Sequence, residues 1–237
     1  MSIIFEERPS DSPYVETVMR GWTLSDGSPI RPAEVHWHMV FVRVNGSVLP
    51  LVVGPWSTAG VVSYLEGAEI LWIKFKLGTF MPHLPTEDVR DAETSLPGAS
   101  SQSFWLNGSA WQFPDYENAD TFVDRLVRED VLVRDPVVKD VLEGQPQGEI
   151  SSRTLRYRFA RATGLTQSHI DQFERAKRAA ALLAQGVPIL DAVFEAGYYD
   201  QPHLTRAVKR FTGYTPGQLI GTGVPESGRR IHTGAAE

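Results

Sequence analysis

Short apolar segments fill the first third of the chain and predict β-strands. Glycine, proline and asparagine separate these segments, and β-branched and aromatic residues dominate within them, which favours strands over helices. An Asn45-Gly46 pair between two of them indicates a hairpin. Several short strands at this spacing predict a small barrel or sandwich. The apolar segments cover residues 37–44, 48–53, 61–65 and 70–77.

Helical periodicity begins after Pro97. Apolar residues recur at helical spacing over 119–131, behind a candidate cap at Asn118, so we expect a helix that closes the strand-rich region. The sequence Arg134-Asp135-Pro136 then interrupts the pattern. It marks either a domain boundary or the start of the next helix.

A first pair of helices is predicted at the start of the basic region, and its leading helix, over 137–149, contains Gly144, Pro146 and Gly148. Ser151 or Ser152 opens a helix whose apolar positions are spaced by four and three residues, and Gly164 ends it. An Ala-rich helix of high helical propensity follows over 168–185 and predicts a rigid spacer.

A second pair of helices follows the spacer. A short apolar helix ends at Gly197, whose backbone can form a tight turn, and Asp200 can cap the next helix, over 201–211. That helix is expected to bury Leu204, Val208 and Phe211. Pro202 is tolerated near its start because a first-turn amide has no helical partner. Both helix pairs end in a similar phrase, FARATGLT over 159–166 and VKRFTGYT over 208–215.

Charge divides the chain in two. Residues 150–221 hold ten Lys and Arg against five acids, and the last sixteen residues are neutral. Because the whole chain carries a net charge of −6, residues 1–149 carry −11. Only the basic block attracts phosphates at long range, so the two blocks are expected to have different tasks.

Composition excludes several classes of protein. The chain has 237 residues, of which 42% are apolar and 22% charged, which is ordinary for a globular protein of one or two domains. No cysteine is present, which excludes disulfides, thiolate catalysis and cysteine-bound metals. A basic leader followed by an apolar stretch is lacking, and so is a run of eighteen apolar residues. We expect a cytoplasmic protein that does not enter a membrane.

Two histidines could bind a metal. His36 and His38 lie two residues apart in a predicted strand, which places both imidazoles on one face of the sheet. A carboxylate and a distant third histidine do not follow in clear positions, and His83 is the only later histidine in this half. The pair is therefore either a metal site or two ordinary surface or pocket histidines. The six tryptophans of this half form either core or the wall of an apolar effector pocket.

The C-terminal third resembles the DNA-binding domain of the AraC/XylS family of transcription regulators. The resemblance covers about residues 137–221 and is most specific in its second half. It departs from the family at Val208, where Phe is common, and in the segment before Ser151, which contains Gly144, Pro146 and Gly148. The matching segments are Ser152-Arg153-Thr154-Leu155, Phe159 to Thr166, Ala192 to Tyr198, Pro202-His203-Leu204-Thr205-Arg206, Lys209-Arg210-Phe211 and Gly213-Tyr214-Thr215-Pro216.

The resemblance implies seven helices and two recognition helices that enter successive major grooves on one side of double-stranded DNA. Arg206 is the contact best supported, because a guanidinium can pair with guanine or hold a phosphate. The surface residues Arg158, Arg161 and Arg178 are as readily explained as solvated side chains. Carried over to this sequence, the residues facing DNA are Ser152, Arg153, Arg156 and Tyr157 in the first unit, and Gln201, Pro202, His203, Arg206 and Lys209 in the second.

The N-terminal half is similar, more weakly, to the cupin-like sensing domains that precede this DNA-binding domain in many members. This implies effector binding or dimerisation. The predicted fold is thus α+β and multidomain: a cupin-like β-barrel with closing helices (1–134), an all-α domain with two helix-turn-helix motifs (135–221) and a disordered tail (222–237) that includes Arg229 and Arg230.

The predicted function is sequence-specific regulation of transcription, without catalysis and without a required cofactor. Expected partners are double-stranded DNA, a small-molecule effector, a second copy of the chain and, for an activator, RNA polymerase. Two alternatives remain open. One is a metal-dependent cupin enzyme fused to a DNA-binding domain, and the other is a helical protein-interaction module.

Overall fold

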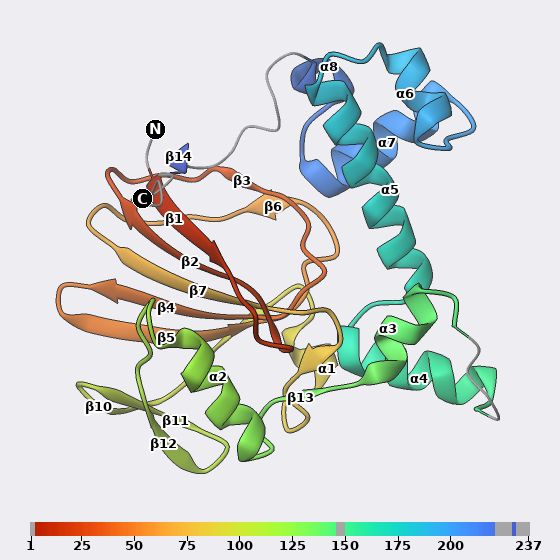
Figure 1. Ribbon diagram of the computed structural model, residues 1–237. Helices are drawn as coiled ribbons and strands as arrows, with labels where there is room; N and C mark the ends of the chain where they lie inside the picture. Colours follow the sequence, from red (N-terminus) through yellow and green to blue (C-terminus); the bar gives the residue numbers. More distant parts are fainter. Residues whose placement is uncertain (1–2, 146–149, 221–228, 231–237) are drawn as a thin grey trace, which may run out of the picture.

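A computed structural model describes residues 3–145, 150–220 and 229–230 (Figure 1). A large sheet occupies the N-terminal region and a group of helices the C-terminal region. The described residues place seven strands in this sheet, in the order β14-β1-β2-β7-β4-β5-β9. These are β14 (Arg229–Arg230), β1 (Ile3–Pro9), β2 (Val15–Thr23), β7 (Glu69–Phe75), β4 (His38–Val44), β5 (Ser47–Val53) and β9 (Glu93–Ser95).

The predicted hairpin is confirmed. Strands β4 and β5 pair antiparallel with Val44 opposite Ser47, and Asn45 and Gly46 adopt φ angles of 49° and 79° between them. Positive φ at both central residues is what the tight hairpin turn requires. Because side chains alternate along β4, one face carries Met39 and Phe41, and the other carries His38 and Val40.

The sheet does not close into the barrel that the sequence predicted. Its described edges are β9 and β14, and the ribbon of β3 (Ile30–Arg31) and β6 (Gly60–Val61) forms a separate two-stranded pair. The N-terminal region is therefore β-rich with an open sheet. Its other strands are β8 (Thr79–Phe80), which pairs with β13 (Val133–Arg134), and the meander β10 (Gly98–Ser100), β11 (Ser103–Leu106) and β12 (Ser109–Gln112).

Helix α2 (Ala119–Arg128) covers one face of the sheet next to the meander (Figure 1). It confirms the predicted helix over 119–131 but ends three residues earlier. Asn118 does not cap it, because its Oδ1 accepts a hydrogen bond from the Asp115 amide at 3.0 Å instead. Phe41 of the sheet packs edge-on against Phe104 of β11 and Phe122 of α2. This aromatic contact joins the three layers.

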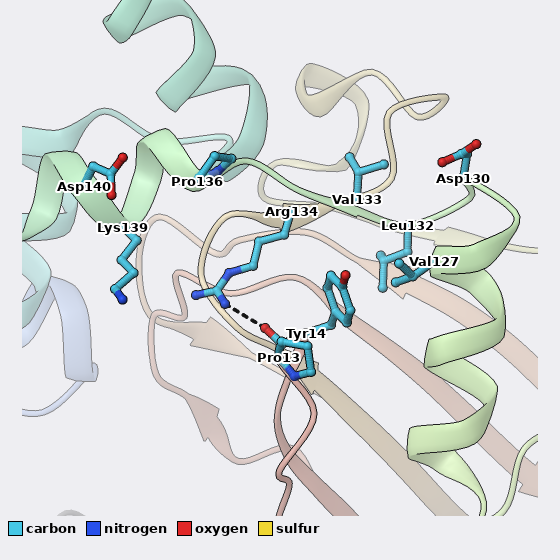
Figure 2. Close-up of a pocket in the computed structure, with 10 residues that line it drawn as sticks. All are labelled: Pro13, Tyr14, Val127, Asp130, Leu132, Val133, Arg134, Pro136, Lys139 and Asp140. Carbon is cyan, nitrogen blue, oxygen red and sulfur yellow. Dashed lines mark hydrogen bonds between the residues drawn. The ribbon is translucent and has the colours of Figure 1, made fainter. Parts of the chain in front are cut away.

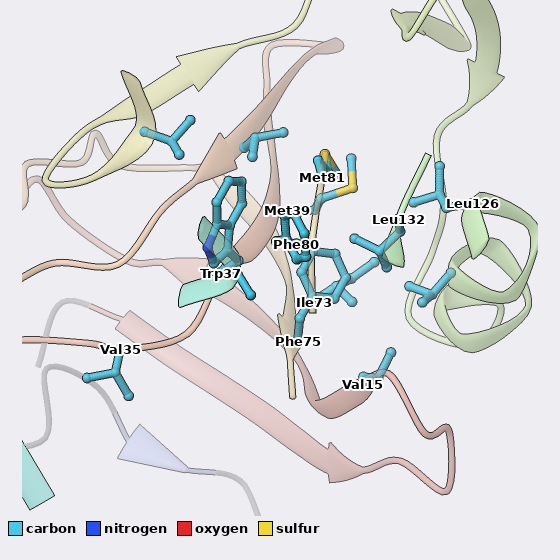
Figure 3. Close-up of a cluster of buried hydrophobic side chains, with 14 of the residues drawn as sticks. Val15, Val35, Trp37, Met39, Ile73, Phe75, Phe80, Met81, Leu126 and Leu132 are labelled. Atoms are coloured by element: carbon cyan, nitrogen blue, oxygen red, sulfur yellow. The ribbon is translucent and has the colours of Figure 1, made fainter. Parts of the chain in front are cut away.

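The core under α2 extends beyond the sheet. Figure 3 shows Trp37, Met39 and Ile73 gathered with Leu126 of α2 and Leu132 behind it. The six tryptophans were interpreted as either core or the wall of an effector pocket. Two are fully buried, three are partly buried and Trp105 is 47% exposed, so burial places only two of them in the core. The same core continues without a break into the C-terminal helices, whose contribution includes Phe159, Leu165, Ile170, Phe173 and Phe211.

Six helices lie between residues 136 and 220 in the described part of the chain, where the resemblance implied seven. The first ends before Gly144, in keeping with the glycine and proline that follow it, and residues 146–149 lie outside the described residues. The helices are α3 (Pro136–Leu142), α4 (Ser152–Thr163), α5 (Gln167–Ala184), α6 (Ile189–Glu195), α7 (Gln201–Thr212) and α8 (Pro216–Leu219). A four-residue helix, α1 (Thr86–Val89), lies in the N-terminal region.

One part of the predicted tail is described. Arg229 and Arg230 form β14, which pairs in parallel with Ile4 and Phe5 of β1, whereas the sequence led us to expect disorder there. The rest of the tail lies outside the described residues.

Candidate DNA-binding surface

Helix α4 has the ends that the sequence predicted. Ser151 is the cap, since its Oγ accepts a hydrogen bond from the Thr154 amide at 3.2 Å, and Gly164 closes the helix with a φ of 74°. Phe159 and Ala162 are buried. The face expected to meet DNA is solvent-exposed: Ser152, Arg153, Arg156 and Tyr157.

Helices α6 and α7 meet in the predicted tight turn. Gly197 has a φ of 70°, and the Asp200 carboxylate caps α7 by accepting a hydrogen bond from the His203 amide at 2.7 Å. The three expected apolar positions of α7 are buried. The residues expected to meet DNA are all exposed: Gln201, Pro202, His203, Arg206 and Lys209. His203 is more than a polar filler, because its ring packs edge-on against Tyr198 at 5.1 Å.

The phrase that ends both α4 and α7 has one local geometry. Thr163 donates its hydroxyl to the Phe159 carbonyl at 2.8 Å and accepts from the Leu165 amide at 3.1 Å. Thr212 does the same with the Val208 carbonyl, at 2.8 Å, and the Tyr214 amide, at 3.1 Å. Both threonines are buried, and each hydroxyl joins a carbonyl four residues earlier to an amide two residues later, beyond the helix end.

Comparison with known families confirms the resemblance for this region. Residues 149–221 match a family model described as a helix-turn-helix domain, of the AraC type. The match covers less than a third of the chain and shows a helix-turn-helix domain over these residues. Comparisons with curated proteins and with solved structures gave no match. The cupin-like resemblance of the N-terminal region is not confirmed.

Two arginines on α5 contact the turn between α6 and α7. The sequence did not single out Arg175, and Arg178 was interpreted as a solvated side chain. The Arg175 guanidinium lies over the Tyr198 ring at 5.0 Å and reaches the Gly197 carbonyl at 3.5 Å. Arg178 reaches the Ala196 carbonyl at 3.4 Å. Burial raises the pKa of Tyr198, and the charge of Arg175 opposes that rise. A cation near the carboxyl end of α6 also suits the helix dipole.

The basic side chains of α4 do not all face solvent. The Arg158 guanidinium binds the Asp135 carboxylate with two hydrogen bonds, at 2.6 and 3.0 Å, and this pairing raises the pKa of Arg158. Arg161 lies over the Phe80 ring at 5.7 Å. Arg158 thus ties α4 to the cap of α3, and Arg161 contacts the N-terminal region, so the DNA-facing charge of α4 consists of Arg153 and Arg156.

The two histidines of the N-terminal region share one carboxylate. His36 Nδ1 is hydrogen-bonded to Glu34 Oε1 at 2.5 Å, and His38 Nε2 lies 3.9 Å from Glu34 Oε2. Both imidazoles thus approach one carboxylate, but only His38 lies in a strand, because β4 begins there and His36 precedes it. Lys74 Nζ completes the group at 2.9 Å from Glu34 Oε2. The sequence signal for the carboxylate was present, but it lies two residues before His36 rather than after it.

Burial and charge compete within this group. Burial opposes ionisation of Glu34, yet the hydrogen bond from His36 and the charges of His36, His38 and Lys74 outweigh it and hold the pKa of Glu34 well below its usual value. Burial lowers the pKa of His38 to about 4, although Glu34 opposes the shift. His38 is therefore neutral at pH 7.

The predicted metal site is not supported. Among the residues that the structure describes, no group of three or more His, Cys, Asp or Glu side chains is placed to hold a metal ion. The ammonium group of Lys74 already supplies the cation that neutralises Glu34.

A pocket of about 360 Å³ lies where the N-terminal region meets α3 (Figure 2). Arg134 crosses it and donates to the Pro13 carbonyl at 2.7 Å. Its wall is largely apolar, with Tyr14 and Leu132, and its rim carries Lys139. None of the described helices is long and apolar enough to span a membrane.

Proposed function

We propose that the chain regulates transcription by binding specific DNA sites through α4 and α7 together, and that its N-terminal region responds to a small-molecule effector. One observation carries the first part. In a domain of the AraC type, the amino-terminal halves of both helices present exposed polar and cationic side chains. The amino end of a recognition helix is the part that reaches base edges in the major groove.

The proposed contacts divide by chemistry. Arg206 would pair with guanine O6 and N7, and Gln201 and His203 would add contacts to base edges. Arg153, Arg156 and Lys209 would bind phosphates, with Ser152, Tyr157 and Pro202 lining the approach. Phosphate contacts release counterions, so affinity should fall with salt, while the base contacts select the sequence.

Two features support an effector response. The core of the N-terminal region is continuous with that of the helix-turn-helix domain, and the pocket of Figure 2 lies at the junction. A ligand that alters this junction would therefore affect both parts. We place the domain boundary at Arg134-Asp135-Pro136, between β13 and α3, and assign residues 135–221 to DNA binding and 1–134 to sensing.

Binding selection on random DNA with the full-length protein tests this proposal. The expected result is an enriched site with two separated halves, whose affinity falls steeply between 50 and 200 mM salt as expected for several phosphate contacts. Enrichment of no sequence would contradict the proposal and favour the protein-interaction alternative. Stoichiometric metal in the purified protein would revive the enzyme alternative.

A further inference from the structure

The carboxyl end of α7 is held by the N-terminal region. The Phe211 carbonyl accepts a hydrogen bond from the Ala33 amide at 2.8 Å, and the Arg210 carbonyl accepts one from the Ala59 amide at 2.9 Å. The last carbonyls of a helix have no partner within the helix. Backbone amides from another part of the chain therefore complete α7.

The carboxyl end of α4 is held in a similar way. The Arg161 carbonyl accepts a hydrogen bond from the Thr86 hydroxyl at 2.7 Å. A Cβ atom on Gly164 would lie 2.8 Å from Thr86 Cγ2 and 2.9 Å from Pro55 Cγ, so the helix end lies directly on these residues. At the end of α7, a Cβ on Gly213 would lie 2.4 Å from Ile30 Cγ2. The two cap glycines thus lie against the N-terminal region at both helix ends.

The residues that hold the two helix ends are themselves connected. Ala33, which contacts the end of α7, precedes Glu34 in the chain. Pro55, which contacts the end of α4, precedes Trp56. Glu34 and Trp56 exchange both backbone hydrogen bonds, at 3.0 and 2.7 Å. We call Ile30, Ala33, Pro55, Ala59 and Thr86 the clamp.

In the described helical region, α5 lies between α4 and α7 (Figure 1). Helix α7 packs mainly on α5, whereas α4 packs on α3, β8 and α1 as well as on α5. The clamp adds a second connection between α4 and α7. Apart from Lys209, which lies in the last turn of α7, the DNA-facing residues lie in the opposite, amino-terminal halves of both helices. All of them are exposed, so the clamp leaves them free.

We propose that the clamp fixes the distance and angle between α4 and α7, and so sets the spacing between the two halves of the DNA site that the protein accepts. This inference rests on the proposed function. It adds a regulatory route, because the clamp residue Ala33 adjoins the Glu34, His36, His38 and Lys74 group, so a change in that group is transmitted directly to the end of α7.

Gly213→Ala tests the clamp, with Gly186→Ala as the matched control. Both glycines have φ above 80° near a helix end, so both substitutions introduce the same backbone strain. Only Gly213 faces the N-terminal region; a Cβ at Gly186 would meet nothing within 4 Å. Ile30→Ala in the Gly213→Ala background removes the methyl group 2.4 Å from the new Cβ and leaves the Ala59 Cβ, at 3.3 Å, as the nearest atom, so it should largely restore the contact.

The readout is the affinity of the full-length protein for its selected DNA site and for versions with one or two base pairs added or removed between the halves. Each added base pair shifts and rotates one half relative to the other, since a turn takes 10–10.5 base pairs. We expect Gly213→Ala to weaken binding to the selected site about tenfold, within the usual range of coupling between sites, and to flatten the dependence on spacing. Gly186→Ala should keep the wild-type dependence.

Recovery of the wild-type spacing dependence in Ile30→Ala/Gly213→Ala would support the clamp, because the rescuing change lies outside the helix-turn-helix domain. Equal spacing profiles for Gly213→Ala and Gly186→Ala, or no recovery in the double variant, would overturn it while leaving DNA binding intact. If the wild-type protein binds no DNA, the proposed function fails first. Urea unfolding of the wild type, Ile30→Ala, Gly213→Ala and the double variant then still measures the coupling between residues 30 and 213.

Discussion

The carboxylate of Asp135 accepts two hydrogen bonds from the guanidinium of Arg158, at 2.6 and 3.0 Å. The same carboxylate caps α3 by accepting from the Val137 amide at 3.0 Å, and the Asp135 amide donates to the Gly78 carbonyl at 2.9 Å. One residue therefore connects the N-terminal region, α3 and α4 at Arg134-Asp135-Pro136, where the sequence indicated either a domain boundary or the start of the next helix; α3 begins there, at Pro136.

Asp135→Ala should lower the free energy of unfolding by about 1–3 kcal/mol, because it removes a helix cap and leaves Arg158 without its partner. Arg158→Ala should cost less, since the cap remains and the Arg158 side chain is 36% exposed. Urea unfolding measures both. Asp124→Ala, an exposed acid on α2, is the control. A cost for Asp135→Ala no larger than that of the control would refute this role.

Arg206→Ala should weaken specific DNA binding by about 1–3 kcal/mol without altering the fold. Arg206 lies exposed in the first half of α7, where a guanidinium can reach a base edge. Arg128→Ala removes an equally exposed arginine from α2, outside the matched domain, and should leave affinity unchanged. Titrations at one salt concentration compare the two. Unchanged affinity in Arg206→Ala would contradict the assignment of α7 as a recognition helix.

The elements recovered from sequence are those fixed by neighbouring residues. Gly164, Gly197 and Asp200 were placed correctly because a positive φ or a cap depends on a few adjacent positions. The Asn45-Gly46 hairpin follows for the same reason. Asn118 shows the limit of such signals, since its side chain accepts a hydrogen bond from the Asp115 amide and does not cap the helix.

The features missed from sequence depend on contacts between distant residues. Glu34 pairs with Lys74, which lies forty positions away, and Arg158 pairs with Asp135, which lies twenty-three positions earlier. The predicted barrel was wrong for a related reason, because short alternating strands predict a β-rich region but do not determine whether its edges meet. The hydrogen bonds from Ala33 and Ala59 involve backbone amides, which leave no trace in residue type.

Thr163→Val and Thr212→Val should each lower the free energy of unfolding by about 1–3 kcal/mol. Each change keeps the shape of the side chain but removes the hydroxyl to which the Leu165 amide or the Tyr214 amide donates. The two costs should be similar, because the two phrases share one geometry. Thr121→Val, on the exposed face of α2, should cost little. A large cost at only one of the two sites would show that the repeat is not equivalent in energy.

The unfolding free energy should fall as the pH drops from 6.5 towards 4, in part through His38. Its pKa is about 4 in the folded protein, against 6.5 for the free side chain. Between these pH values His38 binds a proton in the unfolded chain but not in the folded protein, so a fall in pH favours unfolding. At 1.36 kcal/mol per pKa unit the loss is about 3 kcal/mol at most.

His38→Gln removes that share of the pH dependence. His83 and His169, whose pKa values burial also lowers, would still contribute in the variant. Urea unfolding at pH 7.5, 5.5 and 4.5 should therefore give a shallower decline in His38→Gln than in the wild-type protein, while His203→Gln, at an exposed position, should follow the wild type. An identical decline in all three proteins would mean that His38 titrates normally in the fold and is not held neutral beside Glu34 and Lys74.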